Sequence, residues 1–233
     1  YLKNLFKEVY LKDILERNNI HGEYAFEQLL NIISSGIGSL TNLRKLENTY
    51  KSEINLSISV NTINHYLECL EDAFLIERSD RYDVKGRKYI STQQKYYFTD
   101  LGLRNSRLNF SQFEETHLME NAIYNELRYR GYSIDIGIVE INERQVNGKY
   151  IRKQIEIDFI CNKGAERIYI QSAYSTSSLE KEQQEKRPLN NINDSFRKII
   201  VVKDDILTRK DENGIITMGL KDFITNKNSI DNI

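Results

Sequence analysis

Two short segments in which apolar and polar residues alternate constrain the fold of this chain most strongly. Residues 155–160 have the sequence Ile-Glu-Ile-Asp-Phe-Ile, and residues 167–173 have the sequence Arg-Ile-Tyr-Ile-Gln-Ser-Ala. Alternation with a period of two predicts β-strands, and it puts Glu156 and Asp158 on one face of the first strand. Because neighbouring carboxylates repel each other unless a cation or water lies between them, this strand is a candidate site as well as a core element.

A predicted helix over residues 115–130 precedes these strands and carries an acidic residue on its apolar face. Gly131 is expected to end the helix. Glu120 lies in the middle of the apolar face, whose residues recur with the rotation of about 100° per residue of an α-helix. The residues of that face are Phe113, Met119, Ile123, Tyr124 and Leu127.

A helical Glu, a strand Asp and a polar residue on the next strand resemble, in that order, the core of the PD-(D/E)XK nucleases. The resemblance implies that acidic groups hold a divalent metal, while a Lys two residues past the last acid orients the attacking water. Glu120 and Asp158 match the acids, and Glu156 could add a third metal ligand. Gln171 stands in place of the second strand acid and could coordinate Mg²⁺ through its carbonyl. Ala173 stands where the Lys is expected, so the resemblance predicts the scaffold more strongly than the catalysis.

The remaining C-terminal segments complete an α-β-β-β-α-β order over residues 112–233. Strands are predicted at residues 133–141, 150–161, 167–173 and 197–203, with Asn147-Gly148 as a hairpin turn. Residues 178–186 predict a charged helix that stops before Pro188. A short strand over residues 214–218 and a closing helix over 220–224 follow.

The N-terminal half predicts several helices followed by a hairpin. Helices are expected over residues 1–18, 24–35, 42–51 and 60–74, with Thr41 and Ser59 as the N-caps of the last two. Strands over residues 75–78 and 95–98 enclose a turn at 83–88. Three helices and a hairpin are typical of a winged-helix domain, which we assign to residues 21–106, with a polar connector over residues 106–112.

DNA contact by this predicted winged helix would use two groups of residues. The exposed side of its third helix is expected to carry Asn61, His65, Glu68, Cys69 and Asp72, which include no Lys or Arg and argue against tight base recognition. The hairpin is different, because a cluster of cations there could contact phosphates. These are Arg78, Arg81, Lys85, Arg87 and Lys88. The alternative is a solvated hairpin on a domain that binds a protein partner.

The composition excludes several classes of protein. The net charge is −1, so any nucleic-acid site must be a local patch. No apolar run approaches the ~18 residues needed to cross a membrane, no signal peptide is visible, and no Walker A loop is present. The two cysteines, Cys69 and Cys161, are far apart, which favours a cytoplasmic protein with reduced thiols.

Several longer phrases together resemble the C-terminal region of bacterial and archaeal AAA-type ATPases that carry a C-terminal domain of unknown function. These phrases are YLKNLFKEVYLKDILERNN, YYFTDLGLRN, ETHLMENAIYNELRYRGYSIDIG, IEIDFICNKG and YIQSAYS. The resemblance implies a P-loop ATPase module, then a winged helix, then a nuclease-like domain. Residues 1–20 would then continue from an ATPase module that precedes this fragment, and ATP would bind only in that module.

The predicted fold class is α/β (α+β overall), a winged-helix domain followed by a restriction-endonuclease-like domain. Three functions are compatible with it. The first is a non-catalytic module that binds double-stranded DNA, a protein partner or the ATPase module of the same chain. The second is an active metal-dependent nuclease that uses Glu120 and Asp158, with a Lys such as Lys153 or Lys163 supplied from elsewhere. The third is a purely structural assembly domain.

Overall fold

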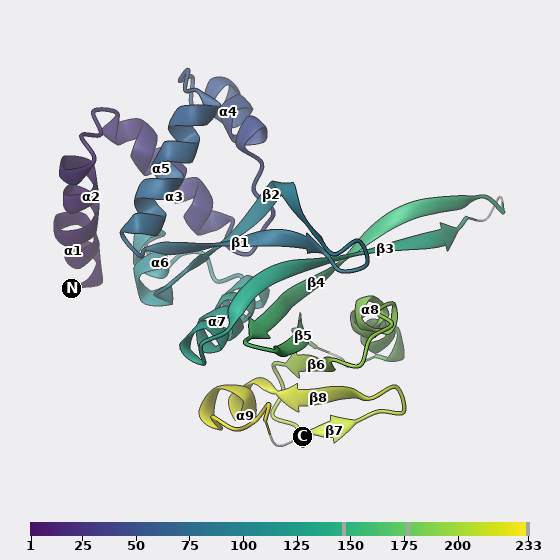
Figure 1. Ribbon diagram of the computed structural model, residues 1–233. Helices are drawn as coiled ribbons and strands as arrows, with labels where there is room; N and C mark the ends of the chain where they lie inside the picture. The colour runs from purple at the N-terminus through teal and green to yellow at the C-terminus, as the bar shows by residue number, and fades with distance from the viewer. Residues whose placement is uncertain (146–147, 176–177, 232–233) are drawn as a thin grey trace. The chain divides into compact units, whose positions relative to one another are not determined.

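The computed structural model describes residues 1–145, 148–175 and 178–231 and confirms the mixed α/β class (Figure 1). The chain divides into two compact units. Unit 1 comprises Tyr1–Ser79 and Thr92–Asn121, and unit 2 comprises Asp80–Ser91 and Ala122–Ile233. These bounds differ from the predicted domains over residues 1–20, 21–106 and 112–233, which remain a prediction.

Unit 1 is mainly helical, and the predicted helices are all present. Its first helix contains a π-helical stretch, η1, between α1 and α2. A helix that was not predicted, α6, lies mostly before the expected connector and ends in its first residues. Asp100 caps it by accepting a hydrogen bond from the Leu103 N–H at 2.9 Å. The helices are α1 (Leu2–Leu5), η1 (Phe6–Leu11), α2 (Lys12–Arg17), α3 (Glu23–Ser35), α4 (Leu43–Ser52), α5 (Val60–Asp72) and α6 (Leu101–Arg107).

Two N-caps were predicted in unit 1, and one of them was wrong. Ser59 caps α5, since its hydroxyl accepts a hydrogen bond from the Thr62 N–H at 3.1 Å. The cap of α4 is Asn42 and not Thr41, because the Asn42 side chain accepts from the Arg44 and Lys45 N–H groups at 3.0 and 3.2 Å. The Thr41 backbone instead forms an isolated antiparallel bridge with Gln94, which holds Thr41 before the helix begins.

The strands form one mixed eight-stranded sheet in the order β2-β1-β3-β4-β5-β6-β8-β7. β3 and β4 are antiparallel, as are β4 and β5, whereas β5 and β6 run parallel. The tip of the β1–β2 hairpin belongs to unit 2, where Arg81–Asp83 pair in parallel with β3. The strands are β1 (Ile76–Asp83), β2 (Lys88–Phe98), β3 (Ser133–Arg144), β4 (Tyr150–Lys163), β5 (Glu166–Ala173), β6 (Arg197–Val202), β7 (Arg209–Lys210) and β8 (Ile215–Gly219).

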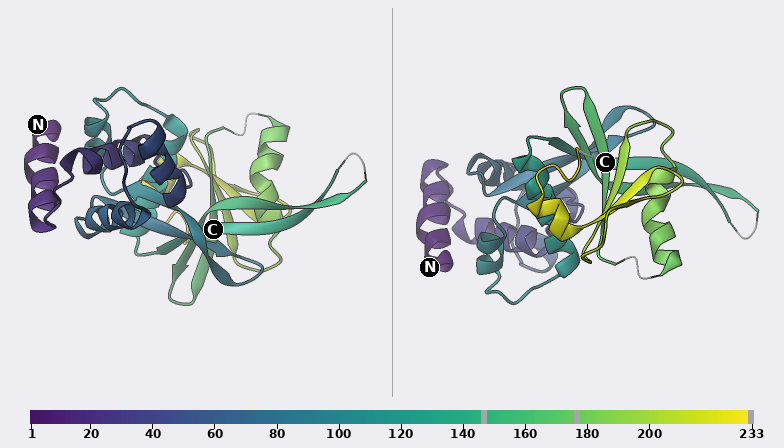
Figure 2. Two further views of the ribbon diagram at one scale, coloured as in Figure 1. Left: turned by 90° about the horizontal axis from the view of Figure 1, so that it is seen from above. Right: turned by 90° about the horizontal axis from the view of Figure 1, so that it is seen from below.

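Within unit 2, β3 and β4 project beyond the other strands as a long two-stranded arm (Figure 2). The predicted Asn147-Gly148 turn falls partly on residues 146–147, which lie outside the described residues. Gly148 has a φ of +78°, a value that favours glycine in a turn. The arm therefore extends the paired region well past the core of the unit.

Three helices accompany these strands: α7 (Glu115–Tyr129), α8 (Leu179–Asn190) and α9 (Leu220–Thr225). α8 packs against β4, β5 and β6, as its position in Figure 1 indicates. Gly131 follows α7 with a φ of +86°, as predicted for a helix end. Helix α7, strands β3 to β5, α8 and β6 follow one another in the order expected from the sequence.

Two boundary predictions were wrong. α8 continues through Pro188 to Asn190, since a proline in the last turn removes only one backbone hydrogen bond near a helix end. Phe113 precedes α7 and is exposed, so it does not belong to the buried face that Met119, Ile123 and Leu127 form. Among the described residues, no helix combines the length and apolar character needed to cross a membrane.

Candidate functional site

Asp158 and Gln171 are brought together on neighbouring strands, as the sequence predicted. Phe159 pairs with Ile170 in the antiparallel register of β4 and β5, so Asp158 lies opposite Gln171. Both side chains are buried. Asp158 Oδ2 accepts a hydrogen bond from the Ser172 N–H at 2.7 Å, and Gln171 Oε1 accepts from the Asp158 N–H at 3.4 Å. These bonds use the polar atoms to fasten the two strands together.

Ala173 occupies the position where the nuclease pattern requires a Lys. Its side chain is 1% exposed and belongs to an apolar cluster that includes Tyr169, Leu189 and Val202. A methyl group in such surroundings can neither orient nor activate a water. Glu156, the proposed substitute acid, is half-buried on β4 and pairs in register with Ile138 of β3.

Glu185, a third polar residue beside this pair, was not predicted from the sequence. Glu185 lies on α8, near the side-chain amide of Gln171. Burial raises the pKa of the Glu185 carboxyl, and the Gln171 amide opposes that rise. The signal that could have identified it is the buried Leu189 four residues later, since residues four apart share a helix face.

Glu120, the helical acid of the predicted metal site, is engaged within unit 1. Its Oε1 lies 3.0 Å from Lys95 Nζ and accepts a hydrogen bond from Tyr97 OH at 2.7 Å. The Lys95 and Glu120 side chains are 5% and 13% exposed. Gly38 approaches the same carboxylate, because a Cβ built there would lie 3.2 Å from Glu120 Oε1. These contacts give Glu120 a structural role.

Among the described residues of unit 2, Asp158, Gln171 and Glu185 lie near one another and could offer oxygen atoms to a cation. However, an oxygen of Asp158 and the carbonyl of Gln171 already accept backbone N–H groups. Within the parts of the chain that the structure describes, no three His, Cys, Asp or Glu side chains gather as metal ligands. Lys153 lies 3.3 Å from Glu143 Oε2, and Lys163 donates to the Arg130 carbonyl at 2.9 Å. The residues present therefore fit a catalytic Mg²⁺ site poorly.

Protein stability is expected to fall as the pH rises above the ordinary Glu pKa of 4.5, in a manner that depends on Glu185. The folded state raises this pKa. The contribution of the Glu185 carboxyl to the free energy of unfolding is therefore fully present below the pKa of the unfolded state, and it is lost as the pH rises through the higher pKa of the folded state. Glu185→Gln should remove that part of the dependence. Urea unfolding at a series of pH values would measure it, with exposed Glu180→Gln as the control. Identical profiles for wild type and Glu185→Gln would contradict the prediction.

The predicted DNA-reading face of α5 is confirmed as exposed only in part. Asn61, His65, Glu68 and Asp72 are exposed. Cys69 was wrongly placed there, because it is buried in the core of unit 1. Apart from His65, the exposed residues of this face are uncharged or acidic. Such a face is poorly matched to the negative potential of a DNA groove.

The five predicted hairpin cations fall into two groups. Arg78 Nε lies 3.9 Å from Glu71 Oε2, and Arg81 Nη2 donates to Gln154 Oε1 at 3.2 Å, so both have partners in the protein. Lys85, Arg87 and Lys88 are exposed at the turn between β1 and β2. Lys85 Nζ donates to the Glu140 carbonyl at 2.8 Å, a neutral partner that leaves its positive charge available to a ligand.

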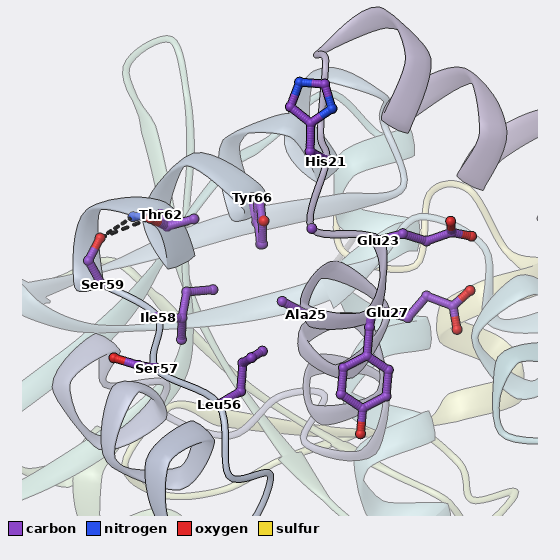
Figure 3. Close-up of a pocket in the computed structure, with 12 residues that line it drawn as sticks. His21, Glu23, Ala25, Glu27, Leu56, Ser57, Ile58, Ser59, Thr62 and Tyr66 are labelled. Carbon is purple, nitrogen blue, oxygen red and sulfur yellow. Dashed lines mark hydrogen bonds between the residues drawn. The ribbon is translucent and has the colours of Figure 1, made fainter.

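Unit 1 has a separate pocket of about 780 Å³ between the start of α3 and the segment that leads into α5 (Figure 3). Leu56 and Ile58 lie on one side of it, while Glu23 and Glu27 lie on the other. Glu27 pairs with Arg107 at 3.2 Å. This lining can receive an apolar group that carries a cation toward Glu23.

Two curated proteins are similar to most of this chain. An uncharacterized protein from Haemophilus influenzae is 30% identical over 200 residues, which cover 86% of this chain and 46% of that protein. Uncharacterized protein MJ1544 from Methanocaldococcus jannaschii is 32% identical over 211 residues, which cover 91% and 44% respectively. The chain therefore spans less than half the length of either relative.

Two further comparisons give a family model that matches part of the chain and a distant structural likeness. Residues 1–114 match the family model of a domain of unknown function, DUF8612. The crystal structure of protein VC1899 from Vibrio cholerae aligns with 88% of this chain and 54% of its own, at a TM-score of 0.30 and 15% identity. A likeness of that extent supports no inference about fold or function. The relationships to AAA-type ATPases, winged helices and nucleases therefore remain predictions.

Proposed function

We propose that this chain is the non-catalytic, nucleic-acid-binding part of a longer AAA-type ATPase, and that its nuclease-like unit serves as a scaffold. The observation that carries the proposal is the exposure of Lys85, Arg87 and Lys88 at one turn. In the described part of the chain, none of the three forms an ion pair with a carboxylate. Three adjacent cations without neutralising partners are suited to phosphate groups.

The non-catalytic role in this proposal is supported by the contacts of the residues that would perform catalysis. Glu120 is paired with Lys95, Asp158 and Gln171 fasten β4 to β5, and Ala173 replaces the Lys. Loss of one group from a cooperative catalytic set removes most of the activity. The helices of unit 1 and the β1–β2 hairpin would form the winged helix, with binding through the hairpin tip and not through α5.

The chain is expected to bind a short duplex DNA with an affinity that falls steeply with salt. The slope of log affinity against log salt concentration is negative. Replacing Lys85, Arg87 and Lys88 together with Ser should make it less steep by about 3, because each lost phosphate contact reduces its magnitude by ~0.9. Fluorescence anisotropy between about 50 and 200 mM salt would measure the slope. The matched control replaces three exposed lysines of unit 1, namely Lys12, Lys45 and Lys51. Equal effects of the two triple variants would contradict a site at the turn.

The same preparation tests the nuclease alternative. Calorimetric titration of Mg²⁺ and Mn²⁺, with and without the duplex, would be compared between wild type and Asp158→Ala. We expect neither metal binding that depends on Asp158 nor cleavage of the duplex. Cleavage that Asp158→Ala abolishes would overturn the scaffold role and make the chain a metal-dependent nuclease.

A further inference from the structure

A pocket of about 630 Å³ in unit 2 joins the cations of the turn to an exposed aromatic ring. Three segments line it: the β1–β2 turn with Lys85 and Arg87, the β4–β5 turn, and the segment between α8 and β6 that carries Phe196. Small-molecule sites commonly have volumes of roughly 300–1,000 Å³. The pocket is therefore large enough for one nucleotide and too small for a duplex.

The acidic side chains of this pocket already have partners. Glu166 forms an ion pair with Arg197 and accepts a hydrogen bond from Tyr132 OH at 3.1 Å. Asp194 accepts from Tyr169 OH at 2.6 Å and from the Phe196 N–H at 3.2 Å. Arg197 balances the charge of Glu166, whereas Asp194 keeps its charge because its donors are neutral. The three lining cations, Lys85, Arg87 and Arg167, outnumber that one carboxylate, so the pocket favours an anionic ligand.

The cations differ in how firmly the protein holds them. The Arg167 guanidinium lies 5.4 Å from the Tyr82 ring centroid and 5.8 Å from that of Phe196, and its Nε donates to Asn162 Oδ1 at 2.8 Å. Arg167 is therefore fixed in the wall of the pocket. Arg87 and Lys85 are exposed at its mouth, where a phosphate can reach them.

The Phe196 ring supplies the second element of recognition. It is 41% exposed although the neighbouring Tyr169 is fully buried and contacts it edge-on, with ring centroids 6.4 Å apart. An exposed aromatic ring beside cations is the combination by which proteins hold single-stranded nucleic acid, with bases stacked on rings and phosphates on basic side chains.

We infer that this pocket binds one nucleotide of a single-stranded nucleic acid, with its phosphate on Lys85 and Arg87 and its base against Phe196. The inference rests on the proposed function, since it deepens the role of the turn, and it specifies an unpaired nucleotide as the ligand. A duplex end or a displaced strand could supply such a nucleotide. Arg167 would keep Phe196 in place and add positive charge at the floor of the pocket.

The chain contains no Trp, so Phe196→Trp introduces a single tryptophan at the proposed stacking position, and this tryptophan can be excited selectively beside the 15 tyrosines. Oligo(dT) should quench its emission, and dTMP should do so at higher concentration. Adding Arg87→Ser should weaken oligo(dT) binding about tenfold. The matched control is Tyr150→Trp, an exposed site on the arm of unit 2, where no quenching is expected. Phe196→Leu should weaken oligo(dT) binding by about 5- to 150-fold, the range that corresponds to losing one base–aromatic stack.

The outcomes separate this inference from the proposed function. Duplex binding that depends on the turn, without quenching by oligo(dT) or dTMP, would overturn the nucleotide pocket and leave the proposed function intact. Quenching without duplex binding would support the pocket and overturn duplex recognition. If dTMP quenched the emission fully at the same concentration as oligo(dT), the pocket would bind a free nucleotide. That result would overturn a single-stranded nucleic acid as its ligand. No binding of any nucleic acid would overturn both.

Discussion

Replacing Lys95 with Met is expected to lower the free energy of unfolding by about 3–5 kcal/mol, the usual cost of removing one partner from a buried ion pair. Lys95 Nζ lies 3.0 Å from Glu120 Oε1, and both side chains are almost inaccessible to water. Methionine fills a similar volume but leaves the Glu120 carboxylate buried without that cation. Tyr97 OH, at 2.7 Å, can compensate only part of the loss because it is neutral.

A double-mutant cycle isolates the ion pair from the packing around it. Glu120→Gln keeps an acceptor for Tyr97 but removes the negative charge, so it should also destabilise the protein. The Lys95→Met/Glu120→Gln variant should be more stable than the sum of the single losses predicts, since neither charge then remains alone. The control is Lys12→Met, which breaks an exposed pair with Glu16 at 4.0 Å and should change the stability by less than about 1 kcal/mol. Urea unfolding would measure each difference.

The sign of the Glu120→Gln effect also decides between two roles for this residue. A carboxylate held in place to bind a metal is repelled by its fellow ligands, so neutralising it commonly stabilises the metal-free protein. Neutralising a carboxylate that balances the charge of Lys95 instead destabilises the protein. A higher midpoint of unfolding for Glu120→Gln, together with loss of Mg²⁺ binding, would return Glu120 to the metal site that the sequence predicted.

Periodicity predicted most of the fold because the long elements bury one regular face. The alternation at residues 155–160 and the helical spacing of Met119, Ile123 and Leu127 correspond to β4 and α7. The two-residue strand β7 has too few residues to show a period. Helix α6 was missed because its seven residues bury Arg104 and Ser106 beside Leu103, so its inner face does not stand out as apolar.

The candidate site could be predicted only where neighbouring strands determine it. Asp158 and Gln171 meet because the β4–β5 hairpin sets their register. Lys95 and Glu185 reach Glu120 and Gln171 from elements distant in the sequence, and tertiary packing alone selects those partners. Of the five predicted hairpin cations, Lys85, Arg87 and Lys88 are exposed at the turn, whereas the proximity of Lys85 and Arg87 to Phe196 required the structure.

Replacing Arg104 with Met is expected to destabilise the protein by about 2–3 kcal/mol, because a buried carbonyl left without a donor, here that of Ser34, costs about 1–3 kcal/mol. Arg104 is fully buried in unit 1. Its Nε donates to the Ser34 carbonyl at 2.7 Å, and its Nη1 donates to the Gln112 carbonyl at 2.8 Å. Ser34 lies in the last turn of α3, where carbonyls lack intrahelical partners and a positive charge is favourable. One side chain thus joins α3, α6 and the segment that precedes α7.

The cost of burying the Arg104 guanidinium limits the expected loss of stability in Arg104→Met without reversing it. Burial lowers the pKa of Arg104, and its Nη2 has no hydrogen-bond partner among the described residues, so the folded protein already bears a desolvation cost that Met would remove. The orphaned Ser34 carbonyl, together with the lost bonds to Gln112 and Asn105, outweighs one unpartnered N–H pair. Arg104→Lys keeps the charge, but a single ammonium lacks the fork that serves two separate carbonyls, so its stability should lie between wild type and Arg104→Met. Chemical unfolding would rank the three, with exposed Arg44→Met expected within about 0.5 kcal/mol of wild type. A stable Arg104→Met protein would show that water or a shifted backbone satisfies both carbonyls.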